Sequence, residues 1–154
     1  MINKPLTPEM FPITYCGIQI NYVDKNTSAE GRNFDTYVEV YPNFFDFDYD
    51  TQIDILQHEV CHTLAEILYK SIPNLYATIM DDTDFGERKT FKNRVYWEGI
   101  FGDVGSNSVD ETFTDCLKIY IRNKKWLKTK HPNVVSKLEK WLTQSGVDVN
   151  EYTI

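Results

Sequence analysis

Residues 50–70 read DTQIDILQHEVCHTLAEILYK, and this stretch decides the fold. Its apolar residues recur three or four positions apart, as they do along one face of a helix: Ile53, Leu56, Val60, Leu64 and Ile67. Further apolar residues fill most of the remaining surface, and a helix of that kind is usually central and buried. We expect Asp48 or Asp50 to cap its start and Pro73 to close the segment.

Two stretches upstream of this helix have the composition of strands. Residues 13–23 are rich in β-branched and aromatic side chains, which predicts one strand. Residues 36–41 alternate, with Val38 and Val40 on one side, which predicts a half-exposed strand. The polar residues 24–35 are expected to be a connection, so the two strands are predicted to form an antiparallel pair.

Two further helices are predicted downstream. One covers about residues 108–122, and the other covers about residues 132–144 and ends at Gly146. Residues 74–107 read as loops with at most one short element. Three aspartates of this stretch are expected to lie on a solvated loop, although they could also favour a basic substrate residue: Asp81, Asp82 and Asp84.

These elements predict an α+β fold with one domain over residues 1–154. A small antiparallel sheet would pack on the central helix, and a second helix would lie beside it. The chain is 42% hydrophobic and 14% aromatic, so it can build a core.

The composition also bears on partners and compartment. The formal charge of −7 argues against binding nucleic acid through a broad basic surface. No apolar run approaches the roughly 18 residues of a membrane span, and the first residues do not resemble a signal peptide. The three cysteines are widely spaced and odd in number, which favours thiols in a reducing compartment. We therefore expect a cytoplasmic protein with no nucleic-acid or membrane partner.

The central helix carries His58 and His62 with Glu59 between them. A spacing of four residues places both imidazoles on one helix face, where both can reach a single zinc ion. Zinc lowers the pKa of a bound water to about 7, and Glu59 is placed to act as general base on such a water. The alternative is a structural cluster without metal. Unpaired polar groups are costly in so apolar a helix, which favours the zinc site.

A catalytic zinc needs a third protein ligand, and Glu111 is the best candidate. Asp115 lies four residues later on the same helix face, where it can accept the free ring N–H of a zinc-binding histidine. Glu98 and His131 remain alternative ligands. Taken alone, Ser108 and Glu111 would also fit a capping box.

The pattern His58-Glu59-x-x-His62 followed by Glu111-x-x-x-Asp115 resembles the gluzincin peptidases, and the small size resembles the catalytic domain of the anthrax lethal factor group. The resemblance covers about residues 36–122. It implies a minimal zincin-like domain, Zn²⁺ held by two histidines and one glutamate, and a peptide or protein substrate.

One feature of that group is missing. Its members have a tyrosine about two turns before the third ligand that helps to stabilise the oxyanion, whereas residues 103–105 here read DVG. Tyr96 or Tyr120 would have to substitute. The resemblance also implies that the strand before the HExxH helix can pair with an extended substrate, through residues that include Tyr37, Val38 and Val40.

Together these features predict a zinc metalloendopeptidase. One alternative is a zinc-binding interaction or inhibitory module without turnover. Another is a structural metal site in which His131 takes the position of the water. The Asn-, Lys-, Asp- and Tyr-rich composition hints at an AT-rich bacterial or phage genome. The oligomeric state is not predicted.

Overall fold

The computed structural model describes residues 3–86, 109–149 and 152–153. The chain forms two compact units, residues 1–67 with 148–154, and residues 68–147. Helix α1 (Tyr49–Ser71) contributes most of its length to the first unit and its last residues to the second. The α+β class predicted from the sequence is confirmed, and the single domain over residues 1–154 stays a prediction.

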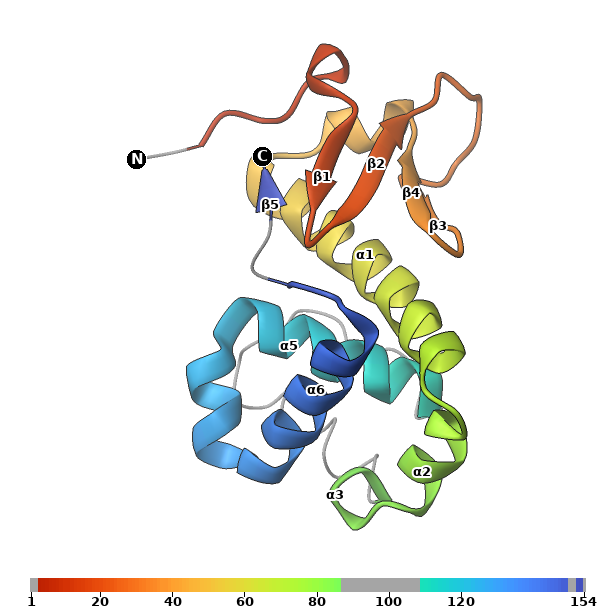
Figure 1. Ribbon diagram of the computed structural model, residues 1–154. Helices are drawn as coiled ribbons and strands as arrows, with labels where there is room; N and C mark the ends of the chain where they lie inside the picture. Colours follow the sequence, from red (N-terminus) through yellow and green to blue (C-terminus); the bar gives the residue numbers. More distant parts are fainter. Residues whose placement is uncertain (1–2, 87–108, 150–151, 154) are drawn as a thin grey trace. The chain divides into compact units, whose positions relative to one another are not determined.

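The first unit contains a mixed sheet, seen in Figure 1. Its strand order among the described residues is β3-β4-β2-β1-β5. Only β2 and β4 run parallel, and the other three neighbouring pairs are antiparallel. The strands are β1 (Ile13–Tyr15), β2 (Ile18–Tyr22), β3 (Gly31–Asn33), β4 (Tyr37–Val40) and β5 (Tyr152–Thr153).

The single strand predicted over residues 13–23 is instead a hairpin. Cys16 and Gly17 form its turn with φ of 52° and 75°, and β1 pairs with β2 so that Ile13 lies opposite Ile20. Positive φ at both central positions is typical of the two-residue turns that match the twist of a hairpin. Because cysteine seldom adopts this conformation, the sequence around Cys16 carries only a weak turn signal.

The predicted antiparallel pairing between residues 13–23 and 36–41 is wrong. β2 and β4 are parallel, with Ile20 opposite Val38. The cause lies in residues 24–35, predicted as a connection, which contain β3. β3 occupies the outer position, and β4 returns between β3 and β2. The predicted antiparallel sheet is therefore mixed.

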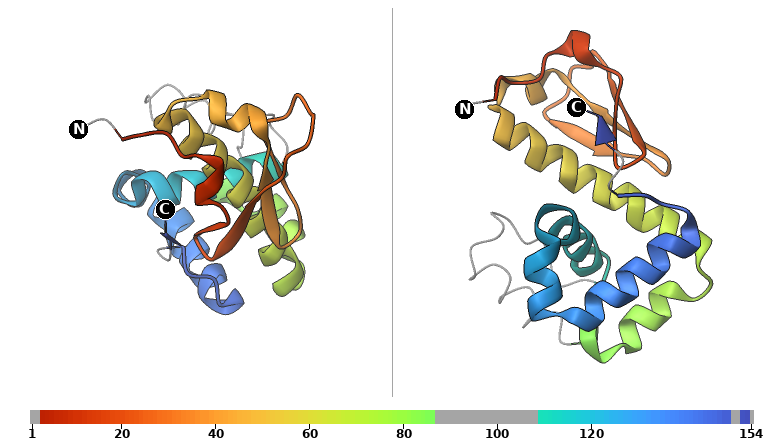
Figure 2. Two further views of the ribbon diagram at one scale, coloured as in Figure 1. Left: turned by 90° about the horizontal axis from the view of Figure 1, so that it is seen from above. Right: turned by 60° about the vertical axis from the view of Figure 1, so that its left-hand side comes forward.

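The prediction for β4 itself is confirmed. Val38 and Val40 are both fully buried, whereas the intervening Glu39 is half-buried. Figure 2 shows α1 lying along the sheet. Gly31 of β3 lies opposite Val40, and a Cβ atom there would contact Ile55 of α1, so the valine face is turned toward this helix. Gln57 of α1 donates a hydrogen bond of 2.9 Å from Nε2 to the hydroxyl oxygen of Tyr15. The predicted central helix is thus the support of the sheet.

Helix α1 begins as the sequence predicts. Asp48 accepts a hydrogen bond of 3.0 Å from the backbone N–H of Thr51, which makes Asp48 the N-cap. Two short 3-10 helices, η1 (Pro8–Met10) and η2 (Pro42–Asp46), precede it. The buried Gln52 accepts a hydrogen bond of 2.7 Å from the backbone N–H of Leu6 and so holds the N-terminal segment on α1.

The second unit contains α2 (Leu75–Asp81), α3 (Thr83–Gly86), α5 (Val109–Lys130) and α6 (Pro132–Ser145). The described part of residues 74–107 therefore holds two helices, where at most one short element was predicted. The predicted helix 108–122 continues to Lys130 beyond a break at Asn123, whose φ of −152° and ψ of 65° are not helical. The helix predicted over residues 132–144 is confirmed, and Gly146 ends it with φ of 74°.

Aromatic side chains form much of the core of this unit. The ring centroid of Trp141 in α6 lies 6.0 Å from that of Phe85 and 5.9 Å from that of Phe113. Phe85 and Phe113 are almost completely buried. Through these contacts α3, α5 and α6 pack together, and α5 and α6 lie side by side in Figure 2.

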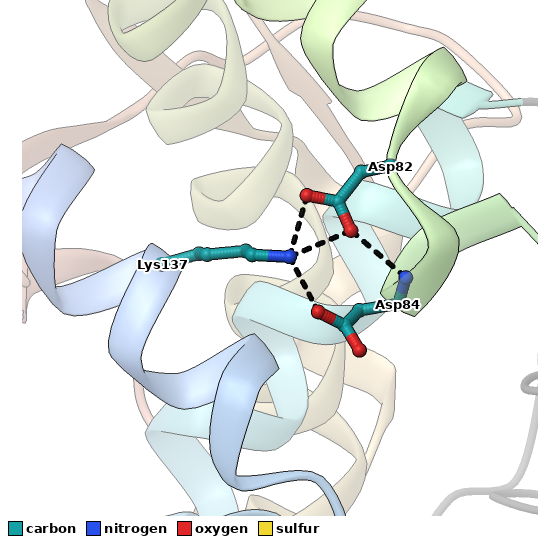
Figure 3. Close-up of polar contacts among 3 residues, drawn as sticks. All are labelled: Asp82, Asp84 and Lys137. Atoms are coloured by element: carbon teal, nitrogen blue, oxygen red, sulfur yellow. Dashed lines mark hydrogen bonds and ion pairs between the residues drawn. The ribbon is translucent and has the colours of Figure 1, made fainter.

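The aspartates expected on a solvated loop take part in this packing. Figure 3 shows the ammonium group of Lys137 in α6 between the carboxylates of Asp82 and Asp84. Asp82 also accepts a hydrogen bond of 2.8 Å from the backbone N–H of Asp84. The expectation of a solvated loop is therefore wrong for these two residues. In the part of the chain that the structure describes, no helix is both long and apolar enough to cross a bilayer.

Candidate metal and catalytic site

The two histidines predicted to bind zinc lie on successive turns of α1. Their ring centroids are 4.7 Å apart, with an interplanar angle of 77°. Both side chains are half-buried. Two imidazoles so close on one helix face can each direct a nitrogen at one ion, and neutral imidazole nitrogen is a common zinc ligand. The geometry of the pair therefore fits two of the three protein ligands that a catalytic zinc requires.

Glu59 lies between the histidines in sequence and faces the edge of the sheet. A Cβ atom added to Gly31 of β3 would lie 3.7 Å from Cγ of Glu59 and 3.7 Å from Cγ2 of Ile55. Glu59 is half-buried. The carboxylate proposed as general base is thus on an ordered helix, next to a strand position that carries no side chain.

The predicted third ligand, Glu111, lies in a different part of the sequence from the two histidines. Glu111 belongs to the second unit, whereas His58 and His62 belong to the first. Among residues 3–86, 109–149 and 152–153, no three His, Cys, Asp or Glu side chains converge as a metal-ligand set. Glu98, the first alternative ligand, lies outside the described residues. His131, the second, precedes α6, and its ring centroid lies 6.1 Å from that of Trp126.

Helix α5 arranges its acidic residues as the sequence predicts. Glu111 is half-buried and Asp115 is buried, one turn apart on the same helix face. Lys118 continues this face and is only 3% exposed. Sequence reasoning missed Lys118, although its spacing of seven residues from Glu111 places it on the same side of a helix. This face of α5 therefore carries two buried charged side chains, those of Asp115 and Lys118.

Tyr120, one of the two tyrosines predicted as possible oxyanion stabilisers, lies on α5 away from Glu111. Tyr120 follows Glu111 by nine residues, which places it on the opposite side of α5, at about 100° per residue. Its hydroxyl donates a hydrogen bond of 3.1 Å to Oε2 of Glu139 in α6. Burial raises the pKa of Tyr120. Its position is therefore part of the α5–α6 packing. Tyr96, the other candidate, lies outside the described residues.

The expected substrate strand also needs correction. Both sides of β4 are occupied, because Val38 lies opposite Ile20 of β2 and opposite Asn33 of β3. Tyr37, Val38 and Val40 therefore have no open edge for a peptide. In the described part of the sheet, the edge next to β4 belongs to β3. A short GRN segment in a polar stretch gives little strand signal, so this edge was not visible in the sequence.

Thr63 is a further residue of this region that the sequence did not single out. It follows His62 in α1 and is fully buried. Its hydroxyl lies 2.7 Å from the carbonyl oxygen of Phe34 and 3.4 Å from that of Tyr37. The only available signal was a polar residue among apolar positions of the helix.

The three cysteines are buried thiols. Cys61 lies between the histidines in sequence but is fully buried in the core. Burial, followed by the negative charge of Asp148, raises the pKa of Cys16 to about 12. Its thiol donates a hydrogen bond of 3.1 Å to the carbonyl oxygen of Val149.

Comparisons with protein-family models, with curated proteins and with solved structures each found no match.

Proposed function

We propose that this protein is a zinc-dependent peptidase of the gluzincin type, which hydrolyses peptide bonds in a peptide or protein substrate. The observation that carries the proposal is the pair of half-buried imidazoles of His58 and His62, with ring centroids 4.7 Å apart. Glu111 would be the third ligand, and Asp115 would orient a zinc-binding histidine from the same face of α5. The buried thiols of the three cysteines support the reducing cytoplasm as its compartment.

When bound, zinc would polarise the substrate carbonyl and lower the pKa of the attacking water. Glu59 would accept the proton of that water and deliver it to the leaving amine. Its place next to the side-chain-free Gly31 keeps the carboxylate beside the sheet edge. The edge of β3 is the position at which an extended substrate would add a strand, and its main-chain groups would hold the peptide.

The test compares the wild-type chain with Glu59→Gln. Zinc content is measured by mass spectrometry of the metal, and cleavage is mapped in a diverse peptide library. We expect about one zinc per chain in both proteins and cleavage only by the wild type. Glu9→Gln is the control, because it makes the same chemical change on an exposed carboxylate of η1, and it should cleave like the wild type.

The other outcomes are equally definite. Cleavage by Glu59→Gln at the wild-type rate would show that Glu59 is not the base. Zinc binding without cleavage by the wild type would favour an interaction or inhibitory module. A chain that binds no zinc would overturn both the peptidase and the zinc-binding interaction module.

A further inference from the structure

The hairpin of β3 and β4 is attached to α1 at the turn that carries His62. The hydroxyl of Thr63 donates to the carbonyl oxygen of Phe34 at 2.7 Å. A threonine hydroxyl inside a helix commonly bonds to a carbonyl of its own preceding turn. Here it reaches a residue 29 positions earlier, directly after β3. The helix and the hairpin are therefore joined directly after the second histidine.

The acceptor belongs to an ordered turn. The backbone N–H of Phe34 donates to the carbonyl oxygen of Tyr37 at 2.8 Å, which closes the connection between β3 and β4. The rings of Phe34 and Tyr37 stack with centroids 4.7 Å apart and planes within 7°. The hydrogen bond from Thr63 to Phe34 therefore fixes the whole end of the β3–β4 hairpin, because Phe34 is itself held within the turn.

The other end of β3 approaches the same helix at Gly31. Gly31 lies opposite Val40, and Asn33 lies opposite Val38, so positions 31 and 33 share the face of the buried valines, which packs on α1. A Cβ atom at position 31 would lie 3.2 Å from the carbonyl oxygen of Glu39 and 3.7 Å from Cγ of Glu59. The tight contact is with Glu39 of the neighbouring strand, whereas Glu59 is at ordinary van der Waals distance. A side chain longer than a methyl group at position 31 would therefore meet the helix where Glu59 projects.

We propose that Thr63 and Gly31 are positioning residues. Together they set the distance of β3 from α1 and determine which β3 residues lie over the helical turn from Glu59 to His62. Thr63 holds one end of the strand by a hydrogen bond. Gly31 avoids a longer side chain, which would separate the other end from Glu59. The role of this register in catalysis rests on the proposed function. A peptide that pairs with β3 would lie at a distance from Glu59 that these two contacts determine. The attachment itself is independent of activity.

The first experiment uses Thr63→Val, which keeps the shape and removes the hydroxyl, with Thr63→Ser as the matched control that keeps it. Amide hydrogen exchange is followed by NMR in the full chain. In Thr63→Val, we expect the amide of Phe34 and the β3 amides to exchange about tenfold faster, the effect of losing one part-buried hydrogen bond. The amides of the β1–β2 hairpin should keep their wild-type rates. Thr63→Ser should resemble the wild type throughout.

The second experiment tests Gly31 by a double-mutant cycle on urea unfolding. Gly31→Ala and Gly31→Val are each combined with Glu59→Ala. Ile55→Ala provides the comparison, because Cγ2 of Ile55 would also lie 3.7 Å from a Cβ atom at position 31. We expect Gly31→Val to lower the unfolding midpoint and Glu59→Ala to recover part of that loss. Gly31→Ala, whose added methyl group is small, keeps the cycle measurable if the valine variant does not fold.

Kinetics give the third readout. In a peptidase of the proposed type, Thr63→Val should lower kcat at least tenfold while zinc content stays at the wild-type level, because a displaced strand misplaces the scissile bond relative to Glu59. Equal exchange rates in Thr63→Val and Thr63→Ser, acceleration spread evenly over all strands, or no coupling between Gly31 and Glu59 would each overturn the positioning role. Failure of the proposed function is distinguishable from these outcomes, because the wild-type protein itself would then bind no zinc or cleave no peptide.

Discussion

The Nζ atom of Lys137 lies 2.6 Å from Oδ1 of Asp82, and it also contacts the carboxylate of Asp84 (Figure 3). Lys137 belongs to α6, whereas the two aspartates flank the start of α3. The side chain of Asp82 is only 13% exposed. One cation thus neutralises two neighbouring carboxylates and joins α3 to α6 beside the aromatic core of the second unit.

Replacing Lys137 by methionine should destabilise the protein. Methionine keeps the apolar stem but removes the ammonium group that lies between Asp82 and Asp84. We expect a loss of about 1–2 kcal/mol in the free energy of unfolding, between the values typical of exposed and buried pairs. Urea unfolding of wild type and Lys137→Met at pH 7 measures it.

The same pair predicts a pH dependence. Burial lowers the pKa of Lys137, but the two aspartates outweigh it, so the pKa is raised above its usual 10.5. A raised pKa adds stability that is complete below the unfolded value and is lost as the pH rises through the folded value. The difference between wild type and Lys137→Met should therefore be constant from about pH 7 to 10 and should shrink at higher pH. A difference that persists unchanged at the most alkaline pH would contradict the ion pair.

Glu111 and Asp115 should affect zinc affinity to different degrees. We expect Asp115→Asn to weaken binding by about 10–100-fold, as is typical when the partner of a metal-binding histidine is removed. Glu111→Gln should weaken binding more, because it replaces a charged ligand by a neutral amide. Competition with a chromophoric chelator gives both constants. Undiminished affinity in Glu111→Gln would move the third ligand to Glu98 or His131.

Tyr120 should be dispensable for hydrolysis. Its hydroxyl is bound to Glu139 on the side of α5 opposite Glu111. We expect Tyr120→Phe to keep the wild-type kcat and to lose about 1–2 kcal/mol of stability with the hydrogen bond to a charged acceptor. Peptide cleavage and urea unfolding measure the two effects. A large fall in kcat without a loss of stability would restore Tyr120 as a candidate oxyanion stabiliser.

Substitutions of Gly17 should destabilise the protein through the backbone conformation alone. Its φ is 75°, and an added Cβ atom would meet no atom within 4 Å. Gly17→Ala is therefore expected to cost about 1–2 kcal/mol through the left-handed conformation rather than through a clash. Gly17→Asn is the control, since asparagine tolerates this conformation better and should cost less. Equal costs for the two variants in thermal unfolding would argue against a backbone origin.

Much of the local structure could be predicted from the sequence. Helix α1, its cap at Asp48, the buried valines of β4 and the end of α6 at Gly146 all agree with the structure. Each depends on neighbours within one or two turns, so hydrophobic spacing and capping chemistry are sufficient signals. The spacing of His58, Glu59 and His62 is of the same kind, because a helix converts a separation of four residues into a shared face.

The pairing of strands could not be predicted in this way. β2 and β4 each have the pattern of a half-buried strand, but that pattern is the same for parallel and antiparallel neighbours. The insertion of β3 at the edge changed the direction of the pairing, and β3 has only three residues. Strand order depends on where the chain returns after a loop, which residue type does not encode locally.

The sequence by itself determined the helix that carries the two histidines and the glutamate, because a short-range period is enough to specify it. Only the tertiary structure decided that Gly31 lies against Glu59, that Thr63 holds the β3–β4 turn, and that Tyr120 faces Glu139. Each of these contacts joins residues from different elements. A hydroxyl or a glycine has many possible partners in the sequence, and packing selects one of them.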